Sequence, residues 1–247
     1  MNLDQFAVIS DIHGNSLALE AVLDDINARE LDTIFNLGDH LYGSLEPATV
    51  AEMLIGDEIV SIAGNQDRII ITPPEDILTT ADHLYIMSQL AQEHLDWLHT
   101  LPPTFRIEDV FLCHGTPDSD ETYLLEQPDR AGGILDMTEA IQERLQGIDA
   151  SLILCGHSHV PRCVWLPDGR LVVNPGSVGM PAYTDDVPYD HKMEAGSPHA
   201  RYAVITRTAN GWQVEQVAVA YDWFAAAAVA RQRGRDDRAR WLETGRA

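Results

Sequence analysis

The spacing of apolar residues divides the chain into short buried strands and amphipathic helices. Continuous apolar runs with β-branched residues are typical of strands that are buried on both faces, and five occur in the first two thirds of the chain: residues 6–10, 33–37, 59–63, 110–113 and 152–155. Alternating or shorter apolar segments predict three further strands, at residues 171–173, 202–206 and 212–219. Apolar positions at helical spacing predict helices over residues 15–29, 47–56, 88–100, 138–147 and 222–245.

The order of these segments indicates the class of fold. Strands and helices alternate at first and mixed strands follow, which predicts a layered α/β protein whose first half is parallel. In this interpretation residues 1–220 form a single domain. Residues 221–247 carry six Arg and four acidic residues in an otherwise strongly acidic chain. We therefore expect a helical tail that docks on the domain, with a homodimer contact as the alternative.

The net charge limits the partners that this chain can have. Lys and Arg number 16 and Asp and Glu number 39, which gives −23 at pH 7. Such a surface repels phosphate backbones and anionic lipids, so we expect neither long nucleic acid nor a membrane as a partner. No apolar run reaches the roughly 18–20 residues that cross a bilayer, and the first residues lack the basic start of a signal peptide. Three cysteines fit free thiols in a reducing compartment, and the predicted location is cytoplasmic.

Residues of the types that bind metals follow each of the five buried strands. Because sites form beyond the carboxyl ends of parallel strands, we expect these side chains to share one crevice. Asp11 and His13 are two positions apart, as are His157 and His159, so each pair points the same way in extended backbone. The full set comprises two carboxylates, one amide and four imidazoles: Asp11, His13, Asp39, Asn65, His114, His157 and His159.

This donor set predicts a pair of metal ions. Mixed nitrogen and oxygen ligands without a thiolate suit Mn, Fe, Zn, Co or Ni. Seven ligands exceed what one tetrahedral ion with an open position needs, and they match two divalent ions about 3.5–4 Å apart. Each residue taken alone would more often be a cap or a turn residue, so the ordered set carries the prediction.

The five blocks D-x-H, G-D, G-N, H-G and G-H-x-H, in this order, resemble the calcineurin-like metallophosphoesterase family over about residues 5–220. The segment Asn-Pro-Gly-Ser-Val-Gly at 174–179 further resembles the bacterial subgroup of small phosphodiesterases. The resemblance implies a four-layer αββα sandwich, with two mixed β-sheets flanked by helices. It also implies a phosphoesterase in which a metal-bridging hydroxide attacks phosphorus in line.

The same resemblance implies a role for each ligand. Asp39 would bridge the two metals, and Asp39 and Asn65 would take part in catalysis. Asp11, His13 and His159 would hold one metal, and Asn65, His114 and His157 would hold the other. Two divalent ions, two carboxylates and a hydroxide leave one positive charge, which suits a phosphoryl group that gains negative charge.

The sequence departs from the family pattern next to Asn65. Many members carry a leaving-group acid there, whereas this chain has Gln66, which donates a hydrogen bond but has no proton to release near pH 7. Three interpretations stay open: another acid, for which His40 is the nearest candidate, a substrate with a good leaving group, or slow turnover of unactivated esters. Gln66 and Arg68 are candidate substrate-binding residues. Arg68 and Arg162 could hold phosphate, or form salt bridges.

Other segments are expected to surround the site or to lie away from it. Residues 179–199 hold three prolines and read as a long loop near the site, either a lid or plain surface. Residues 116–129 could wall the same cleft. His83, His94 and His99 lie in the helical middle of the chain, and we expect them to face solvent. Cys113 and Cys155 are expected to pack as small buried hydrophobes.

The sequence therefore predicts a phosphoesterase that acts on small phosphodiesters or nucleotide-type phosphoanhydrides. The partner is a small phosphate ester or nucleotide, because the negative surface makes long nucleic acids poor substrates. Two alternatives remain: a phosphomonoesterase or protein phosphatase, and a non-catalytic metal-binding scaffold. Metal content together with turnover of an activated diester distinguishes them.

Overall fold

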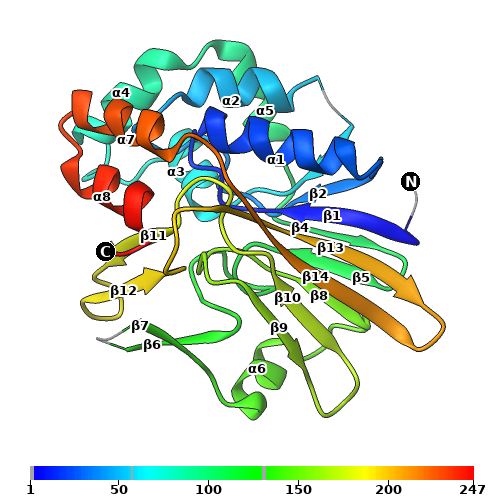
Figure 1. Ribbon diagram of the computed structural model, residues 1–247. Helices are drawn as coiled ribbons and strands as arrows, with labels where there is room; N and C mark the ends of the chain where they lie inside the picture. The colour runs from blue at the N-terminus through cyan, green and yellow to red at the C-terminus, as the bar shows by residue number, and fades with distance from the viewer. Residues whose placement is uncertain (1–2, 57, 130–131) are drawn as a thin grey trace.

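Two five-stranded mixed sheets face each other, and helices cover their outer sides (Figure 1). This computed structural model describes residues 3–56, 58–129 and 132–247. The first sheet has the strand order β14-β13-β1-β2-β3, with β1, β2 and β3 parallel to one another and β13 and β14 antiparallel additions. Its strands are β1 (Gln5–Ile9), β2 (Ile34–Asn36), β3 (Ile59–Ser61), β13 (Ala200–Thr208) and β14 (Gly211–Val219).

The second sheet has the order β4-β5-β8-β10-β9. Its three central strands are parallel, and both edge strands pair antiparallel to them. Its strands are β4 (Thr104–Ile107), β5 (Val110–Cys113), β8 (Leu152–Leu154), β9 (Arg162–Trp165) and β10 (Leu171–Asn174). Two separate two-stranded hairpins complete the strands of the described residues: β6 (Glu126–Asp129) with β7 (Gly132–Leu135), and β11 (Ala182–Asp185) with β12 (His191–Glu194).

Most of the helices lie on the outer side of the first sheet, whereas α6 covers the second (Figure 1). The helices are α1 (Ser16–Ala28), α2 (Pro47–Leu54), α3 (Asn65–Ile71), α4 (Ala81–Gln89), α5 (Gln92–Thr100), α6 (Thr138–Arg144), α7 (Trp223–Gln232) and α8 (Asp236–Thr244). Among the described residues, none of these helices is both long and apolar enough to cross a membrane.

The alternation of side chains along β1 explains why its apolar run is continuous. Phe6 and Val8 point between the two sheets, where they meet side chains of the second sheet such as Leu112. Ala7 and Ile9 point the opposite way, into the core beneath the helices of the first sheet. A third core lies between the second sheet and α6. Three apolar layers between four layers of elements confirm the predicted αββα sandwich.

The structure corrects several boundaries. The helix expected over 88–100 begins at Gln92, because Leu90 and Ala91 adopt extended backbone after α4. The helix expected over 222–245 is broken at Gly234, which has a φ of +75°. Residues 179–199 are not a structureless loop, since they contain the β11–β12 hairpin. No prediction covered helix α3, nearly all of helix α4, or strands β4, β6, β7, β9, β11 and β12.

Two of the three histidines expected in solvent are buried. His94 turns its ring back on its own helix, where Nδ1 accepts from the backbone N–H of Ala91 at 3.2 Å. His83 is buried as well, and only His99 is exposed. Cys113 and Cys155 are fully buried in the third core, as expected.

The C-terminal segment packs as two helices against the rest of the chain. Ala226, Ala227 and Ala230 of α7 join Leu242 of α8 and Leu45 in a small apolar cluster. The alanine run of α7 is thereby used for close packing between helices. Phe224 stays 64% exposed, and a homodimer through this segment stays a prediction.

Candidate metal centre

Strands from both sheets end at one place. The loop after β1 and the loop after β2 are joined by backbone hydrogen bonds from Asp11 N to Gly38 O and from His13 N to Asp39 O, both 3.0 Å. The loops after β5 and β8 are joined by Gly156 N and His114 O at 2.8 Å. Five parallel strands end in this region: β1, β2, β3, β5 and β8. All seven predicted ligands therefore lie close together, as expected for residues beyond the carboxyl ends of parallel strands.

The backbone of this region is unusual. Seven non-glycine residues among those described have a positive φ, and five of them are predicted ligands. Left-handed backbone is uncommon for side chains other than Asn, Asp and His, and strain of this kind clusters at functional sites. The five are Asp11 (56°), His13 (50°), Asp39 (57°), His157 (66°) and His159 (59°).

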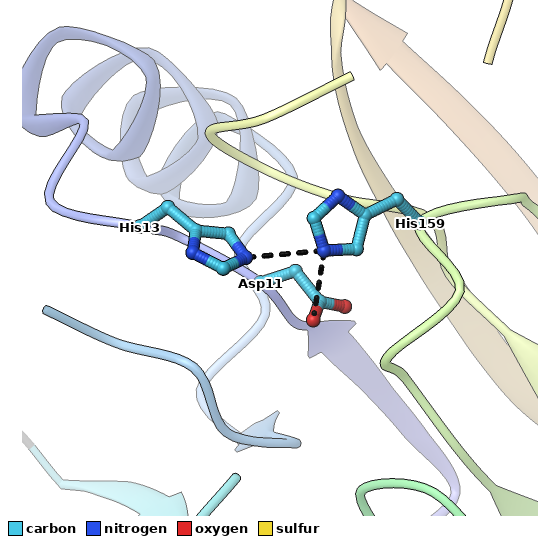
Figure 2. Close-up of side chains that lie close together, drawn as sticks. All are labelled: Asp11, His13 and His159. Atoms are coloured by element: carbon cyan, nitrogen blue, oxygen red, sulfur yellow. Dashed lines mark hydrogen bonds and ion pairs between the residues drawn. The ribbon is translucent and has the colours of Figure 1, made fainter. Parts of the chain in front are cut away.

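One group of three side chains consists of Asp11, His13 and His159. Figure 2 shows them pointing toward one another, with His13 Nε2 3.1 Å from His159 Nε2 and His159 Nε2 3.4 Å from Asp11 Oδ1. Two nitrogens bound about 2.1 Å from a common ion, at tetrahedral or octahedral angles, lie roughly 3.0–3.4 Å apart. The spacing of the two imidazoles therefore fits a shared ion.

A second group consists of Asp39, His114 and His157. Asn65 joins it, since its Oδ1 lies 3.1 Å from His114 Nε2. Asp39 Oδ2 lies 3.5 Å from His114 Nε2 and 3.7 Å from His13 Nε2. This carboxylate oxygen thus lies between the two groups, where a bridging ligand would be placed.

The histidines are oriented by the nitrogen that faces away from the centre. Each of the four places that nitrogen within 3.0 Å of a backbone carbonyl, so that in the neutral ring the other nitrogen is the one with a free lone pair. Since two imidazole lone pairs cannot bond each other, a cation satisfies this arrangement. The carbonyls belong to Tyr42 for His13, Leu37 for His114, Glu121 for His157 and Met180 for His159.

The electrostatics of the centre also fit cations. Asp11 Oδ1 is buried and has no hydrogen-bond partner among the described residues. Burial raises the pKa of Asp39, but the imidazoles of His114 and His13 outweigh this and hold its pKa below the usual range. Burial lowers the pKa of His114, but Asp39 and Asp11 overcome it and raise the pKa to about 10. A centre that keeps a proton on a buried imidazole is compensating for buried negative charge.

Two of the other imidazoles, His13 and His157, are held neutral. Burial lowers the pKa of His13, assisted by His159, to about 4. Burial likewise lowers the pKa of His157, assisted by His114, to about 4. Metals bind neutral imidazole, so both side chains are in the correct protonation state at pH 7.

Two glycines are required beside the carboxylates. A Cβ at Gly64 would lie 2.2 Å from Asp39 Oδ1, and a Cβ at Gly156 would lie 2.1 Å from Ser10 Oγ and 3.0 Å from Asp11 Oδ2. Only glycine permits so close an approach of backbone to side chain. The glycines of the G-N and G-H-x-H blocks are therefore needed for close packing.

Two further polar residues hold the loops in place. Asp67 accepts hydrogen bonds from the backbone N–H groups of Asp39, His40 and Gly64 at 2.8–3.0 Å, and so ties the loop after β2 to that after β3. Ser177 Oγ donates to the carbonyl of Asp11 at 2.7 Å. The segment 174–179 thus supports the loop after β1.

A cleft of about 320 Å³ opens onto the centre. Of the predicted residues, His13, Asp39, Asn65, His157, His159 and Gln66 line it. Part of segment 179–199, which the sequence places near the site, lines the cleft as well, including Tyr183 and Asp185 of β11. Sequence reasoning missed the rest of the lining, which includes Tyr42, Arg235, Asp237, Arg238 and Trp241.

Two predicted residues lie elsewhere. His40 is fully buried, donates from Nδ1 to Asp67 Oδ2 at 2.8 Å and contacts the edge of Trp97, so it does not line the cleft. Arg68 forms ion pairs with Asp120 at 2.8 Å and Glu121 at 2.7 Å and does not line the cleft either. Neither placement suits the role predicted for it. His40 is buried away from the cleft, and the guanidinium of Arg68 is already engaged by two carboxylates.

Comparisons with known proteins agree with this site. Residues 5–189 match the calcineurin-like phosphoesterase superfamily domain. An uncharacterized protein of Methanocaldococcus jannaschii, MJ0912, is 28% identical over 197 residues, which cover 71% of this chain and 76% of that protein.

Two solved structures have the same fold. The metallophosphoesterase from Sphaerobacter thermophilus is 25% identical, with a TM-score of 0.76 over 99% of this chain and 100% of that chain. The hypothetical protein PH1004 from Pyrococcus horikoshii is 18% identical, also with a TM-score of 0.76, over 98% of each chain. The family match covers the ligands of both groups. The chain therefore belongs to the calcineurin-like phosphoesterase superfamily and is a phosphoester hydrolase.

Proposed function

We propose that this protein hydrolyses small phosphodiesters or nucleotide-type phosphoanhydrides at a dinuclear metal centre. The observation that carries the proposal is the position of Asp39 Oδ2, which lies 3.7 Å from His13 Nε2 and 3.5 Å from His114 Nε2. One carboxylate oxygen between two complete ligand groups is the arrangement that two ions with a common ligand require.

Each residue of the centre has a defined task in this proposal. Asp11, His13 and His159 hold one divalent ion, Asn65, His114 and His157 hold the other, and Asp39 contacts both. Ions bound there supply a hydroxide near neutral pH and offset charge on a phosphoryl group. The chain itself fixes the positions of the ligands through the backbone carbonyls behind the imidazoles.

The cleft favours small substrates. A volume of about 320 Å³ is near the lower end of the range for small-molecule sites. The net charge of −23 disfavours approach of a long polyanion. Together these features support a substrate of nucleotide size.

The chemistry of the cleft favours good leaving groups. Among the described residues that line it, every histidine is a candidate metal ligand, so none remains to donate a proton to a leaving group. Gln66 lines the cleft and can only donate a hydrogen bond. Aryl diesters and phosphoanhydrides, whose leaving groups depart without a proton, are therefore the preferred substrates.

The proposal is tested by reconstitution. Metal-free protein is loaded separately with Mn, Fe, Zn, Co and Ni, and metal content is measured together with turnover of bis(4-nitrophenyl) phosphate and 4-nitrophenyl phosphate. We expect about two ions per chain and faster turnover of the diester. Preference for the monoester would support the phosphomonoesterase alternative, and bound metal without turnover of either compound would support the non-catalytic scaffold.

A further inference from the structure

Helix α8 contributes a charged wall to the cleft that opens onto the metal centre. Arg235, Arg238 and Trp241 line the same cavity as His13 and Asp39. Arg238 and Trp241 are three positions apart, so they lie on one face of the helix. Arg235 and Arg238 are nearly 200 positions along the chain from Asp39, the ligand that follows β2.

The two arginines of this wall differ in how they are engaged. Arg235 uses both edges of its guanidinium, with Nε and Nη2 bonded to Asp237 at 3.0 and 2.7 Å and Nη1 bonded to Asp82. Arg238 makes a single bond, from Nη2 to Asp82 at 2.8 Å. Its Nε and Nη1 are buried and have no partner among the described residues.

A third donor without a partner lies on the same face. Trp241 is only 6% exposed, and its Nε1 has no hydrogen-bond partner among the described residues. Folded proteins leave few buried donors unpaired, and each such group calls for an explanation. Three unpaired donors on one face of α8, two of them on a cationic group, form a site for an anionic acceptor.

A small neighbouring void does not account for these donors. It has a volume of about 10 Å³ and is lined by His13, Ser44 and Arg238, but not by Trp241. A void of this size holds about one water molecule. Because Trp241 does not line this void, a water molecule there cannot satisfy the whole set.

The acidic residues around Arg238 do not use all of its hydrogen-bond donors. Asp237 is paired with Arg235, and Asp82 is shared between Arg235 and Arg238. Tyr42 also lies near this guanidinium and is neutral at pH 7, because burial raises its pKa. Asp185, on β11, is the remaining acidic residue of the wall. Two carboxylates thus offset the two guanidiniums, and Asp185 adds one negative charge to the wall. The feature that favours an anion is therefore the pair of Arg238 donors that have no partner among the described residues.

We propose that Arg238, together with Trp241 Nε1, binds a second phosphate group of the substrate while the scissile phosphate lies at the metal centre. This rests on the proposed function of the centre. The substrate class is then narrower: a small diester or anhydride of nucleotide size that carries a further phosphate. Arg238 is a specificity-determining residue in this scheme, and the hydrolytic step itself does not depend on it.

The test uses two chromogenic substrates that differ by one phosphate. Thymidine 5′-(4-nitrophenyl phosphate) and its 3′-phosphorylated form release the same 4-nitrophenolate from the same phosphorus. We expect the metal-loaded protein to turn over the 3′-phosphorylated compound with a kcat/KM about 10-fold higher or more. R238Q should abolish this preference, so that kcat/KM becomes about equal for the two compounds.

Binding gives a second readout that is independent of turnover. Calorimetry compares thymidine 3′,5′-bisphosphate with thymidine 5′-monophosphate on the same metal-loaded proteins. R238Q should weaken binding of the bisphosphate about 10-fold and of the monophosphate about twofold or less. If neither chromogenic compound is turned over, the proposed function fails, whereas the binding comparison still decides the role of Arg238.

Matched variants separate binding from folding. R240Q removes the same charge from an exposed position of the same helix and should preserve the preference. W241F keeps the packing and removes only Nε1, so it should lower the preference about threefold. Should R238Q not fold, R238M replaces it, and its melting temperature is measured first. Equal kcat/KM for both compounds in the unaltered protein, or a preference that survives loss of Arg238, would overturn the proposal.

Discussion

The metal centre and the wall of its cleft are built in different ways. The ligands of the centre lie at the ends of five strands, in backbone that is tied by hydrogen bonds between loops, and five of them have left-handed φ values. The wall comes from the β11–β12 hairpin and α8, which are joined to the sheets by packing. The centre therefore has little freedom to change. The β11 side of the wall is tied to it, because Tyr183 Oη donates to the carbonyl of His157 at 3.0 Å. No hydrogen bond or ion pair between described residues joins α8 to a ligand, so α8 can vary more freely. Chemistry common to a family belongs to the first region, and choice of substrate to the second.

The strongest test of this division is D39N. We expect turnover of every substrate to fall by about 10³-fold or more and one ion per chain to be lost, because the amide cannot supply a second anionic oxygen. Steady-state kinetics and metal analysis on the same sample measure both effects. D185N, in the wall, is the matched control. A fall confined to one substrate would contradict the division.

The pH dependence of stability in the metal-free protein probes the centre alone. The pKa values of His13 and His157 are about 4 in the fold, below the ordinary value of 6.5. Their stabilisation is therefore complete above pH 6.5 and is lost as the pH falls toward 4, since the unfolded chain takes up protons that the fold does not. By pH 5 the loss is about 2 kcal/mol for each histidine. The raised pKa of His114 has the opposite sign and offsets part of this loss.

Urea unfolding of the metal-free protein at pH 7.5 and at pH 5.0 measures this loss. The double variant H13Q/H157Q should show a much smaller change between the two pH values. The variant H99Q, altered at an exposed position, should behave like the unaltered protein. A free energy of unfolding that is the same at both pH values would mean that the centre does not hold these imidazoles neutral.

D67N tests whether the hydrogen bonds that hold the ligand loops are as important for metal binding and activity as the ligands. Asn places an N–H₂ group among three backbone donors, so we expect metal affinity or activity to fall about 10–100-fold. D96N changes an exposed Asp of α5 and serves as control. An activity loss that excess metal does not reverse, in a protein that still folds, would indicate displaced ligands. No loss at all would show that the loops are fixed by other contacts.

The smallest expected effect is at Gln66, where centre and wall meet. Q66H adds a group that can release a proton, so we expect turnover of an alkyl diester to rise about 10-fold relative to an aryl diester, below the range of a well-placed acid. The ratio of the alkyl-diester rate to the aryl-diester rate, compared between Q66H and Q66A, measures this gain. Equal changes for both diesters would mean that leaving-group protonation does not limit the rate.

Much of the centre was predictable because each strand and the ligand at its end are neighbours in the sequence. A continuous apolar run followed by Asp, Asn or His gives both the strand and the position of the ligand at its end, as for β1 with Asp11 and β5 with His114. Adjacency along the chain was less informative. His40 follows Asp39 directly, but the positive φ of Asp39 turns the chain so that His40 faces Trp97.

The wall could not be predicted because it depends on tertiary packing. The cationic tail pointed to docking on an acidic body, but no pattern placed Arg238 and Trp241 beside His13. Segment 179–199 held enough Pro and Gly to look irregular, and its short hairpin strands are stabilised by pairing with each other. His94 illustrates the same limit, since its burial follows from a cap on its own helix.

The match to the superfamily ends at residue 189, whereas α8 begins at Asp236. The hydrolytic machinery and the arginines of the wall are thus encoded in separate stretches of the chain. The solved structures that share this fold nevertheless cover 98–99% of the chain, so the final helix is part of the common architecture and not an appendage. Substitutions in α8 thus alter the cleft without changing any residue that the superfamily match covers.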